Sequence, residues 1–192
     1  MKTDIARILA PLVFALATVP AFADNANFLD EARNVASSIP PKLLAVLQEE
    51  IAKGGPEGAI NVCREKAPQM AKEASQKTGW NIRRVSLKNR NPKAVPDAWE
   101  QAALQDFDKR SFAGENPSSL EKGEIVTEDN TKVYRYIKAL PTQNLCISCH
   151  GSSENISAAV KAKLKELYPN DKATGYAPGE IRGAMTIKRS IQ

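Results

Sequence analysis

A short run in the last third of the chain, Cys146-Ile147-Ser148-Cys149-His150, has the residue types and spacing of a c-type haem attachment motif. Two thiols three positions apart can form thioether bonds to the two vinyl groups of one haem, and the histidine that follows can then bind the iron. The sequence therefore predicts one covalent haem c, attached through Cys146 and Cys149, with His150 as the proximal iron ligand.

Three other chemistries are open to these residues. A thioredoxin-like redox pair belongs at a strand-to-helix junction early in a βαβ unit, whereas this motif lies late in the chain. A Cys146–Cys149 disulfide leaves His150 and Cys63 without a role. The strongest competitor is structural zinc, because Cys63, Cys146, Cys149 and His150 form a Cys₃His set. Adjacent Cys149 and His150 fall outside the usual zinc spacings, so haem is the favoured interpretation.

The second axial position of the iron cannot be filled by another histidine, because the chain has one histidine and three cysteines. The candidates for this distal position are Met70, Met185, Cys63, a lysine, or no residue at all.

A helix predicted over residues 56–77 carries two of these candidates. Small and sulfur-containing residues recur along one side of it at helical spacing: Ala59, Cys63, Ala67, Met70 and Ala74. Alanines beside Cys63 would let a flat macrocycle approach the helix closely. Pro68 cannot donate a hydrogen bond to the carbonyl of Arg64, so we expect a distortion just past Cys63. On the residues alone, Cys63 and Met70 stand about equal as distal ligands.

Hydrophobic periodicity and turn signals predict an α+β domain, with a small antiparallel sheet covered by helices. Helices are expected over residues 27–37, 42–53, 56–77, 97–109 and 157–167, with Asp97 as an N-cap. Strands are expected over residues 80–87, 123–128, 131–140 and 180–189. Pro40-Pro41 should separate the first two helices, Gly54-Gly55 should end the second, and Asp129-Asn130 should form a hairpin turn.

The N-terminus has the pattern of a secretory signal peptide over residues 1–23. Lys2 and Arg7 precede an apolar run over residues 8–19, and Ala21-Phe22-Ala23 supplies the small residues that a signal peptidase reads. The apolar run is shorter than the roughly 20 residues of a transmembrane helix. We therefore expect cleavage before Asp24, a periplasmic location, a single domain over residues 24–192, and no membrane span after cleavage.

Composition and charge narrow the function classes. The formal charge is +5, basic residues alternate with acidic ones, and aromatic residues make up only 6% of the chain, so no nucleic-acid-binding stripe is present. If the only histidine binds iron, a Ser–His–Asp hydrolase site is impossible. We expect a protein that is not an enzyme, does not bind nucleic acid, and is a monomer or weak dimer.

Several polar and aromatic side chains remain as possible haem contacts. An arginine is well suited to pair with a haem propionate, although a single exposed arginine is more often solvated or ties down a loop. The polar candidates are Arg83, Arg84, Arg90, Arg110, Tyr134 and Tyr136. The expected core or haem-packing residues are Trp99, Phe107, Leu140 and Leu145.

Blocks of residues in a fixed order resemble the family of haem-c-containing, PAS-like sensor domains. They are Ala59-Ile60-Asn61-Val62-Cys63-Arg64, Arg83-Arg84-Val85-Ser86, Arg90-Asn91-Pro92, Pro96-Asp97-Ala98-Trp99-Glu100, Leu145-Cys146 through Gly151, Asp171-Lys172-Ala173-Thr174-Gly175-Tyr176 and Arg182-Gly183-Ala184. The resemblance covers most of the chain after the signal peptide. It implies a PAS-like antiparallel sheet with long N-terminal helices, and axial ligation of the haem iron by His150 and Cys63.

The resemblance also implies a class of function. Members of this family occur as stand-alone exported proteins and as sensing segments of bacterial receptors, so the implied role is a sensor of redox state or of a diatomic gas. CO, NO or O₂ would bind to the ferrous form. An anionic thiolate ligand stabilises Fe(III), which implies a low reduction potential. The alternative function is a low-potential periplasmic electron-transfer protein with an unknown redox partner.

Overall fold

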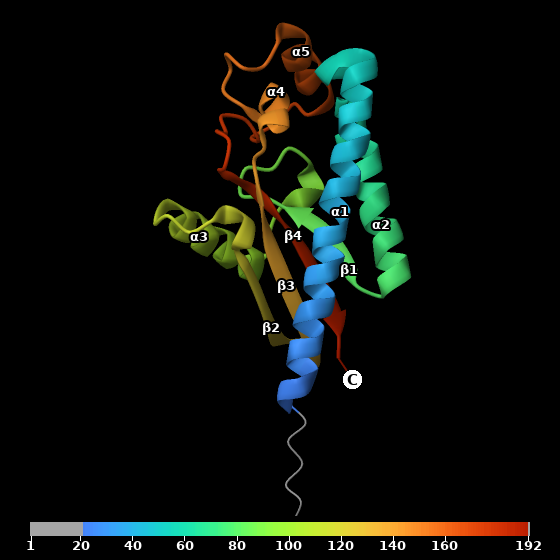
Figure 1. The fold of residues 1–192 in the computed structure, drawn as a ribbon, viewed down its shortest axis with the longest axis vertical. Coiled ribbons are helices and arrows are strands. Elements are labelled where there is room, and N and C mark those ends of the chain that lie inside the picture. The colour runs from blue at the N-terminus through green and yellow to red at the C-terminus, as the bar shows by residue number, and fades with distance from the viewer. Residues whose placement is uncertain (1–20, 192) are drawn as a thin grey trace, which may run out of the picture.

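The computed structural model describes residues 21–191, so most of the predicted signal peptide lies outside the described residues. One antiparallel sheet of four strands, in the order β1-β4-β3-β2, forms the centre of the molecule (Figure 1). The strands are β1 (Asn81–Val85), β2 (Glu121–Glu128), β3 (Thr131–Pro141) and β4 (Ile181–Ser190). The last strand of the chain, β4, therefore lies in the interior of the sheet, between β1 and β3.

Along the chain, helices precede the sheet and lie between its strands. The long ones are α1 (Ala21–Gly58), α2 (Ala67–Thr78), α3 (Ala98–Phe112) and α5 (Ala158–Leu167), and α4 (Ile147–His150) is a single turn. A π-helical turn, η1 (Val62–Lys66), joins α1 to α2. Short 3₁₀ turns are η2 (Pro92–Ala94), η3 (Pro117–Ser119) and η4 (Asn144–Cys146). No helix of the described part of the chain combines the length and the apolar character needed to cross a membrane.

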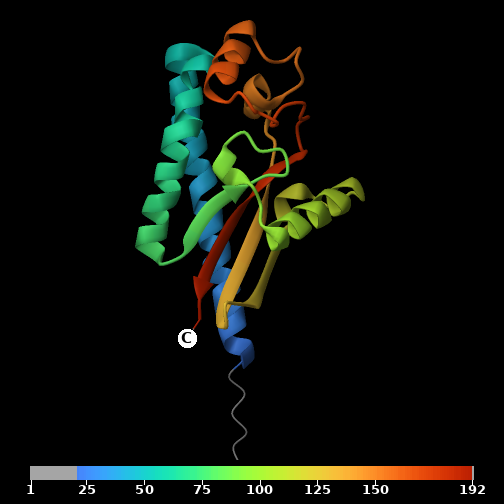
Figure 2. The same cartoon turned by 180° about the vertical axis from the view of Figure 1, so that it is seen from behind.

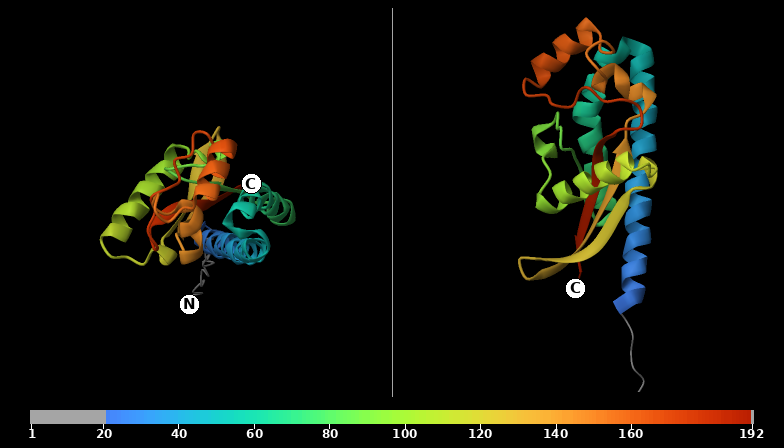
Figure 3. Two further views of the ribbon diagram at one scale, coloured as in Figure 1. Left: turned by 90° about the horizontal axis from the view of Figure 1, so that it is seen from above. Right: turned by 90° about the vertical axis from the view of Figure 1, so that its left-hand side faces the viewer.

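The two faces of the sheet are covered by different helices. Viewed from above, α1 and α2 lie on one side of the strands and α3 lies on the other (Figure 3). The core under α1 contains Trp80, Tyr134 and Ile187, and the core under α3 contains Leu104 and Phe107. Helices α4 and α5 and their loops sit together at one end of the sheet (Figures 1 and 2). The predicted α+β architecture is confirmed.

Two local predictions are confirmed in detail. Asp129 and Asn130 form the turn between β2 and β3 with φ angles of 48° and 63°, the left-handed conformation that two-residue hairpins require. Asp97 caps α3 by accepting a hydrogen bond from the Glu100 backbone, and the Glu100 side chain accepts from the Asp97 backbone.

The predicted break at Pro40-Pro41 is wrong, because α1 runs through both prolines. Helical geometry is lost later, at Gly54 and Gly55, where Gly55 has φ 71° and ψ 178°, as expected for a glycine stop. A proline inside a helix costs a hydrogen bond and a clash with the preceding turn. Here Ala32, Ala36 and Ile39 are buried in the molecule, so packing of α1 stabilises the helix across that defect.

Glu121, at the start of β2, joins the sheet to α1. Its carboxylate accepts hydrogen bonds from Arg33 Nε at 2.9 Å, Arg33 Nη2 at 2.6 Å and the Tyr136 hydroxyl at 2.7 Å. Burial raises the pKa of Glu121, but the hydrogen bonds from Arg33 and Tyr136 and the charge of Lys138 outweigh burial and lower that pKa to about 2.

This pKa predicts a loss of stability in acid. The ordinary pKa of a glutamate here is 4.5, so ionised Glu121 stabilises the fold above about pH 4.5, and the contribution is lost as the pH falls toward 2. Glu121→Gln should lower the free energy of unfolding at neutral pH by about 2 kcal/mol and flatten its decline below pH 4.5. Denaturant unfolding at a series of pH values measures both. Glu115→Gln, at an exposed pair with Arg110, is the matched control, and an equal effect there would contradict the prediction.

Candidate functional site

The Cys-x-x-Cys-His motif lies where β3 leads through η4 into α4, at the end of the sheet (Figure 1). Residues three and four apart share one side of a helical turn, so Cys146, Cys149 and His150 are neighbours. Cys146 and His150 are buried, Cys149 is half-buried, and all three thiols of the chain are free. The residue after the motif is Gly151. A Cβ at this position would stand 2.7 Å from the carbonyl oxygen of Ile147, which leaves no room for a side chain.

His150 is held in one orientation by the segment that precedes β4. Its Nδ1 lies 2.7 Å from the carbonyl oxygen of Ala173, and its own carbonyl accepts a hydrogen bond from the Tyr176 backbone at 3.0 Å. A carbonyl oxygen only accepts, so Nδ1 carries the proton and Nε2 has the free lone pair. Burial and the charges of Arg182 and Arg90 hold the pKa of His150 well below its ordinary value. His150 is therefore a neutral imidazole with Nε2 ready to bind a metal.

Arg90 ties the motif to the same segment. Its Nε donates to Asp171 Oδ2 at 2.9 Å, and its Nη2 donates to the carbonyl of Cys149 at 2.6 Å. Asp171 in turn accepts from the Ala173 backbone at 2.8 Å. Both Arg90 and Asp171 have side chains only 12% exposed, so this ion pair is shielded from solvent. The ion pair positions Cys149, which precedes His150 in the chain, and Ala173, whose carbonyl bonds to the imidazole.

Cys63 lies on the π-helical turn η1, and its residue is exposed. The expected distortion near Pro68 is present, because π-helical pairing spans Val62–Lys66. Burial, followed by the neighbouring Cys63 and Cys146, raises the pKa of Cys149 to about 11. The structure thus brings Cys63 into the neighbourhood of the motif, from a point more than eighty residues earlier in the chain. Among the described residues, no group of three or more His, Cys, Asp or Glu is close enough to hold a metal ion.

The two methionine candidates occupy different places. Met185 is 3% exposed and packs in the core under α1 with Trp80 and Ile82. Met70 is half-buried on α2, and the neighbouring Ala71 and Ala74 pack against that same core. Of the two, only Met70 lies outside the core cluster.

Most of the other candidates have structural partners. Arg83 pairs with Glu100, Arg110 with Glu115, and the Tyr136 hydroxyl with Glu121. Tyr134 packs in an aromatic cluster with Phe28 and Trp80. The aromatic and apolar candidates are core residues to different degrees: Phe107 is buried, Trp99 and Leu140 pack against the core clusters, and Leu145 is half-buried.

Arg84 and Arg182 lie near the motif, and neither has a carboxylate partner among the described residues. Arg182 was not among the haem contacts predicted from the sequence. Burial, and then the charge of Arg182, lowers the pKa of Arg84 to about 10, and the nearby groups acting the other way are Cys63 and Cys146. Arg182 Nε is buried with no hydrogen-bond partner among the described residues. The only sequence signal for Arg182 is its place in the last block of the family resemblance, because a single arginine at a strand start has no periodicity.

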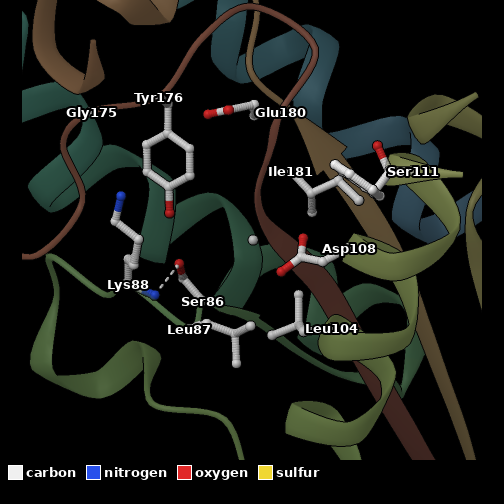
Figure 4. A pocket seen from close by; sticks show the side chains of 12 residues that line it. Ser86, Leu87, Lys88, Leu104, Asp108, Ser111, Gly175, Tyr176, Glu180 and Ile181 are labelled. Carbon is white, nitrogen blue, oxygen red and sulfur yellow. Dashed lines mark hydrogen bonds between the residues drawn. The ribbon is translucent and has the colours of Figure 1, made fainter. Parts of the chain in front are cut away.

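A cleft of about 470 Å³ lies on another side of the segment that anchors His150. It is bounded by α3, by the residues after β1 and by residues 175–183, and Asp108, Glu180 and Tyr176 are among its lining (Figure 4). Burial and then Glu180 raise the pKa of Asp108. None of the predicted haem ligands lines this cleft, but Tyr176 belongs both to it and to the backbone contact with His150.

Comparisons with known proteins support the fold and the family. The crystal structure of the cyanobacterial haem protein Tll0287 aligns with a TM-score of 0.59 and 24% sequence identity, over 90% of this chain and 99% of that chain. The two proteins share the mixed arrangement of helices and antiparallel sheet. Comparison with curated protein sequences finds no match. The Tll0287-like family model matches residues 22–190, which confirms the resemblance seen in the sequence, and the chain belongs to the Tll0287-like family.

Proposed function

We propose that this protein is an exported, single-haem c-type cytochrome that senses redox state or a diatomic gas through a haem ligated by His150 and Cys63. The observation that carries the proposal is the state of His150. It is buried and neutral, with Nδ1 bonded to the Ala173 carbonyl and Nε2 free, and it directly follows two free thiols with the spacing of a haem attachment motif. The similar Tll0287 is a haem protein, which supports the same cofactor here.

The residues around His150 fit a haem in three ways. Cys146 and Cys149 lie on the side of the turn that bears His150, as thioether formation requires. Cys149 packs against an apolar cluster that can cover a macrocycle, made of Ile60, Ile156, Val160 and Leu164 with Leu167 and Tyr168 at its edge. Arg84 and Arg182 supply positive charge close to the motif, which would favour a cofactor with negatively charged groups.

A bound haem would supply an iron that changes oxidation state and accepts small ligands. His150 supplies the proximal nitrogen, and the bond to Ala173 keeps its imidazole from rotating. Cys63 supplies the distal sulfur from η1. With both positions filled by protein, no site remains for an enzyme substrate, so we propose a binding and signalling role in the periplasm rather than catalysis.

Cys63 is the residue that can convert a redox change into a movement. An anionic thiolate holds Fe(III) more tightly than Fe(II), so after reduction the Cys63 sulfur is more readily protonated and released. Cys63 lies in an exposed π-helical turn, a distorted geometry common at functional sites. Release of the sulfur would free this turn to rearrange and would open the distal position to CO, NO or O₂.

A low-potential electron-transfer protein is the second candidate function. The rigid anchoring of His150 and the shielded Arg90–Asp171 pair favour it, since little would reorganise on that side when an electron moves. The two functions differ in what Cys63 does on reduction.

The cofactor is tested on the purified protein. After expression with a c-type maturation system, the chain should begin at Asp24 and carry one haem that acid–acetone does not extract, because two thioethers hold it. Intact mass and a pyridine haemochrome spectrum measure this, and Cys146→Ala with Cys149→Ala is the control that removes the covalent link. Colourless protein with stoichiometric zinc, or pigment that is extracted, would show that the proposal is wrong.

Cys63→Ala should change the ferric spectrum and raise the reduction potential, because the anionic ligand that stabilises Fe(III) is removed. The distal position then becomes open or passes to Met70. Met70→Leu is the matched control and should leave coordination unchanged. An unaltered ferric spectrum in Cys63→Ala, or altered coordination in Met70→Leu alone, would exclude Cys63 as the ligand.

The sensor function predicts that the ferrous protein binds CO or NO with displacement of Cys63, while the ferric protein does not bind CO. Amide hydrogen exchange over residues 59–74 should speed up on reduction, because the π-helical turn is no longer held by the sulfur. CO titration and hydrogen-exchange mass spectrometry of both oxidation states measure these effects. A ferrous form that refuses CO and exchanges at the ferric rate would favour electron transfer instead.

A further inference from the structure

Six of the nine arginines in the described part of the chain are paired with carboxylates. The pairs among the described residues are Arg33–Glu121, Arg83–Glu100, Arg90–Asp171, Arg110–Glu115, Arg135–Asp97 and Arg189–Glu31. Arg64 has no such partner but is exposed, so water solvates its charge. Arg84 and Arg182 remain. Both residues are half-buried, and the Nε of Arg182 is buried with no hydrogen-bond acceptor among the described residues.

The surroundings of these two arginines contain an excess of positive charge. Arg182 is the neighbouring cation that acts on Arg84, the two groups that act the other way are the thiols of Cys63 and Cys146, and no carboxylate is among these neighbours. Arg182, Arg90 and Arg84 all act on His150 with the same sign. A buried cation is costly unless an anion accompanies it, and two adjacent cations are more costly still. The fold of this chain therefore leaves a site that an anion with two negative groups would neutralise.

We infer that Arg84 and Arg182 form a binding site for a pair of carboxylates, and, given the proposed function, that these are the two propionates of the haem attached at Cys146 and Cys149. Arg84 lies at the end of β1 beside Cys63 and Cys146, and Arg182 lies at the start of β4 beside His150. A guanidinium presents a planar fork of donors that matches a carboxylate, which makes arginine suited to this task.

Arg182 also lies next to the cleft that Tyr176 lines. Its carbonyl accepts a hydrogen bond from Ser86 Oγ at 2.8 Å, and Ser86 and Tyr176 both line the cleft shown in Figure 4. Its charge also acts on Tyr176. The residues on either side of Arg182, Ile181 and Gly183, line that cleft. A shift of a propionate bound to Arg182 would therefore be transmitted to the cleft through this arginine.

The test uses the haem-loaded protein and the variants Arg84→Met and Arg182→Met, with Arg64→Met as a control that removes an exposed arginine beside Cys63. Resonance Raman spectroscopy reports the propionate bending modes, and potentiometry reports the ferric-to-ferrous equilibrium. Arg84→Met and Arg182→Met should each shift the propionate modes. Each should also move the ferric-to-ferrous equilibrium at least about tenfold toward the ferric form, because a poorly screened positive charge is lost. Arg64→Met should leave the modes unchanged and move the equilibrium less than about threefold.

Lysine variants separate loss of charge from loss of packing. Arg84→Lys and Arg182→Lys keep the charge and should return the equilibrium to near the wild-type value, and lysine variants that match the methionine variants would overturn the inference. Inorganic phosphate added to the wild-type protein should change neither readout, and a shift would mean that the arginines hold a free anion instead of the propionates. If haem is attached but the methionine variants behave like Arg64→Met, this inference fails while the proposed function stands. If no haem is attached, the proposed function itself fails.

Discussion

The hydrogen bond between His150 Nδ1 and the Ala173 carbonyl is the contact on which the rest of the site depends. It fixes the tautomer and direction of the only imidazole in the chain, and it docks the motif on the segment that leads into β4. Since β4 pairs with both β1 and β3, the orientation of this imidazole is tied to the interior of the sheet. Arg90, through its bonds to Asp171 and to the Cys149 carbonyl, holds the same two segments together, and so does the backbone bond from Tyr176 to His150.

Charge is distributed unevenly around this anchor. Most arginines elsewhere in the described chain have carboxylate partners, as Arg189 does in joining β4 to Glu31 of α1. Around His150 the arginines outnumber the carboxylates, so a buried, neutral imidazole lies near Arg84 and Arg182. Burial is the main cause of the lowered pKa of His150, the positive charge of the arginines lowers that pKa further, and the same charge favours an anionic group beside the imidazole. A haem would suit both features, because its iron binds a neutral imidazole and its ionised propionates are anionic.

Local chemistry was predictable from the sequence, and long-range placement mostly was not. The Asp129-Asn130 turn and the Asp97 cap follow from residues within four positions of each other, so the pattern contains all the information needed. The continuity of α1 through Pro40-Pro41 was missed because it depends on the packing of Ala32, Ala36 and Ile39 against the rest of the molecule. The expectation that proline ends a helix considers only residues close in sequence. Arg182 was missed because its importance comes from what is absent around it, namely a carboxylate, and that is visible only in three dimensions.

The two sides of the site differ in how firmly they are held, and this difference bears on function. On the His150 side, a buried hydrogen bond, a shielded ion pair and backbone contacts act together. On the Cys63 side, an exposed residue sits in a π-helical turn between two regular helices. Movement of His150 would break several contacts at once, whereas Cys63 is held by the backbone of one distorted turn. Under the proposed ligation, reduction of the iron would therefore move Cys63 and spare His150, and the movement of Cys63 would reach α1 and α2, which η1 joins.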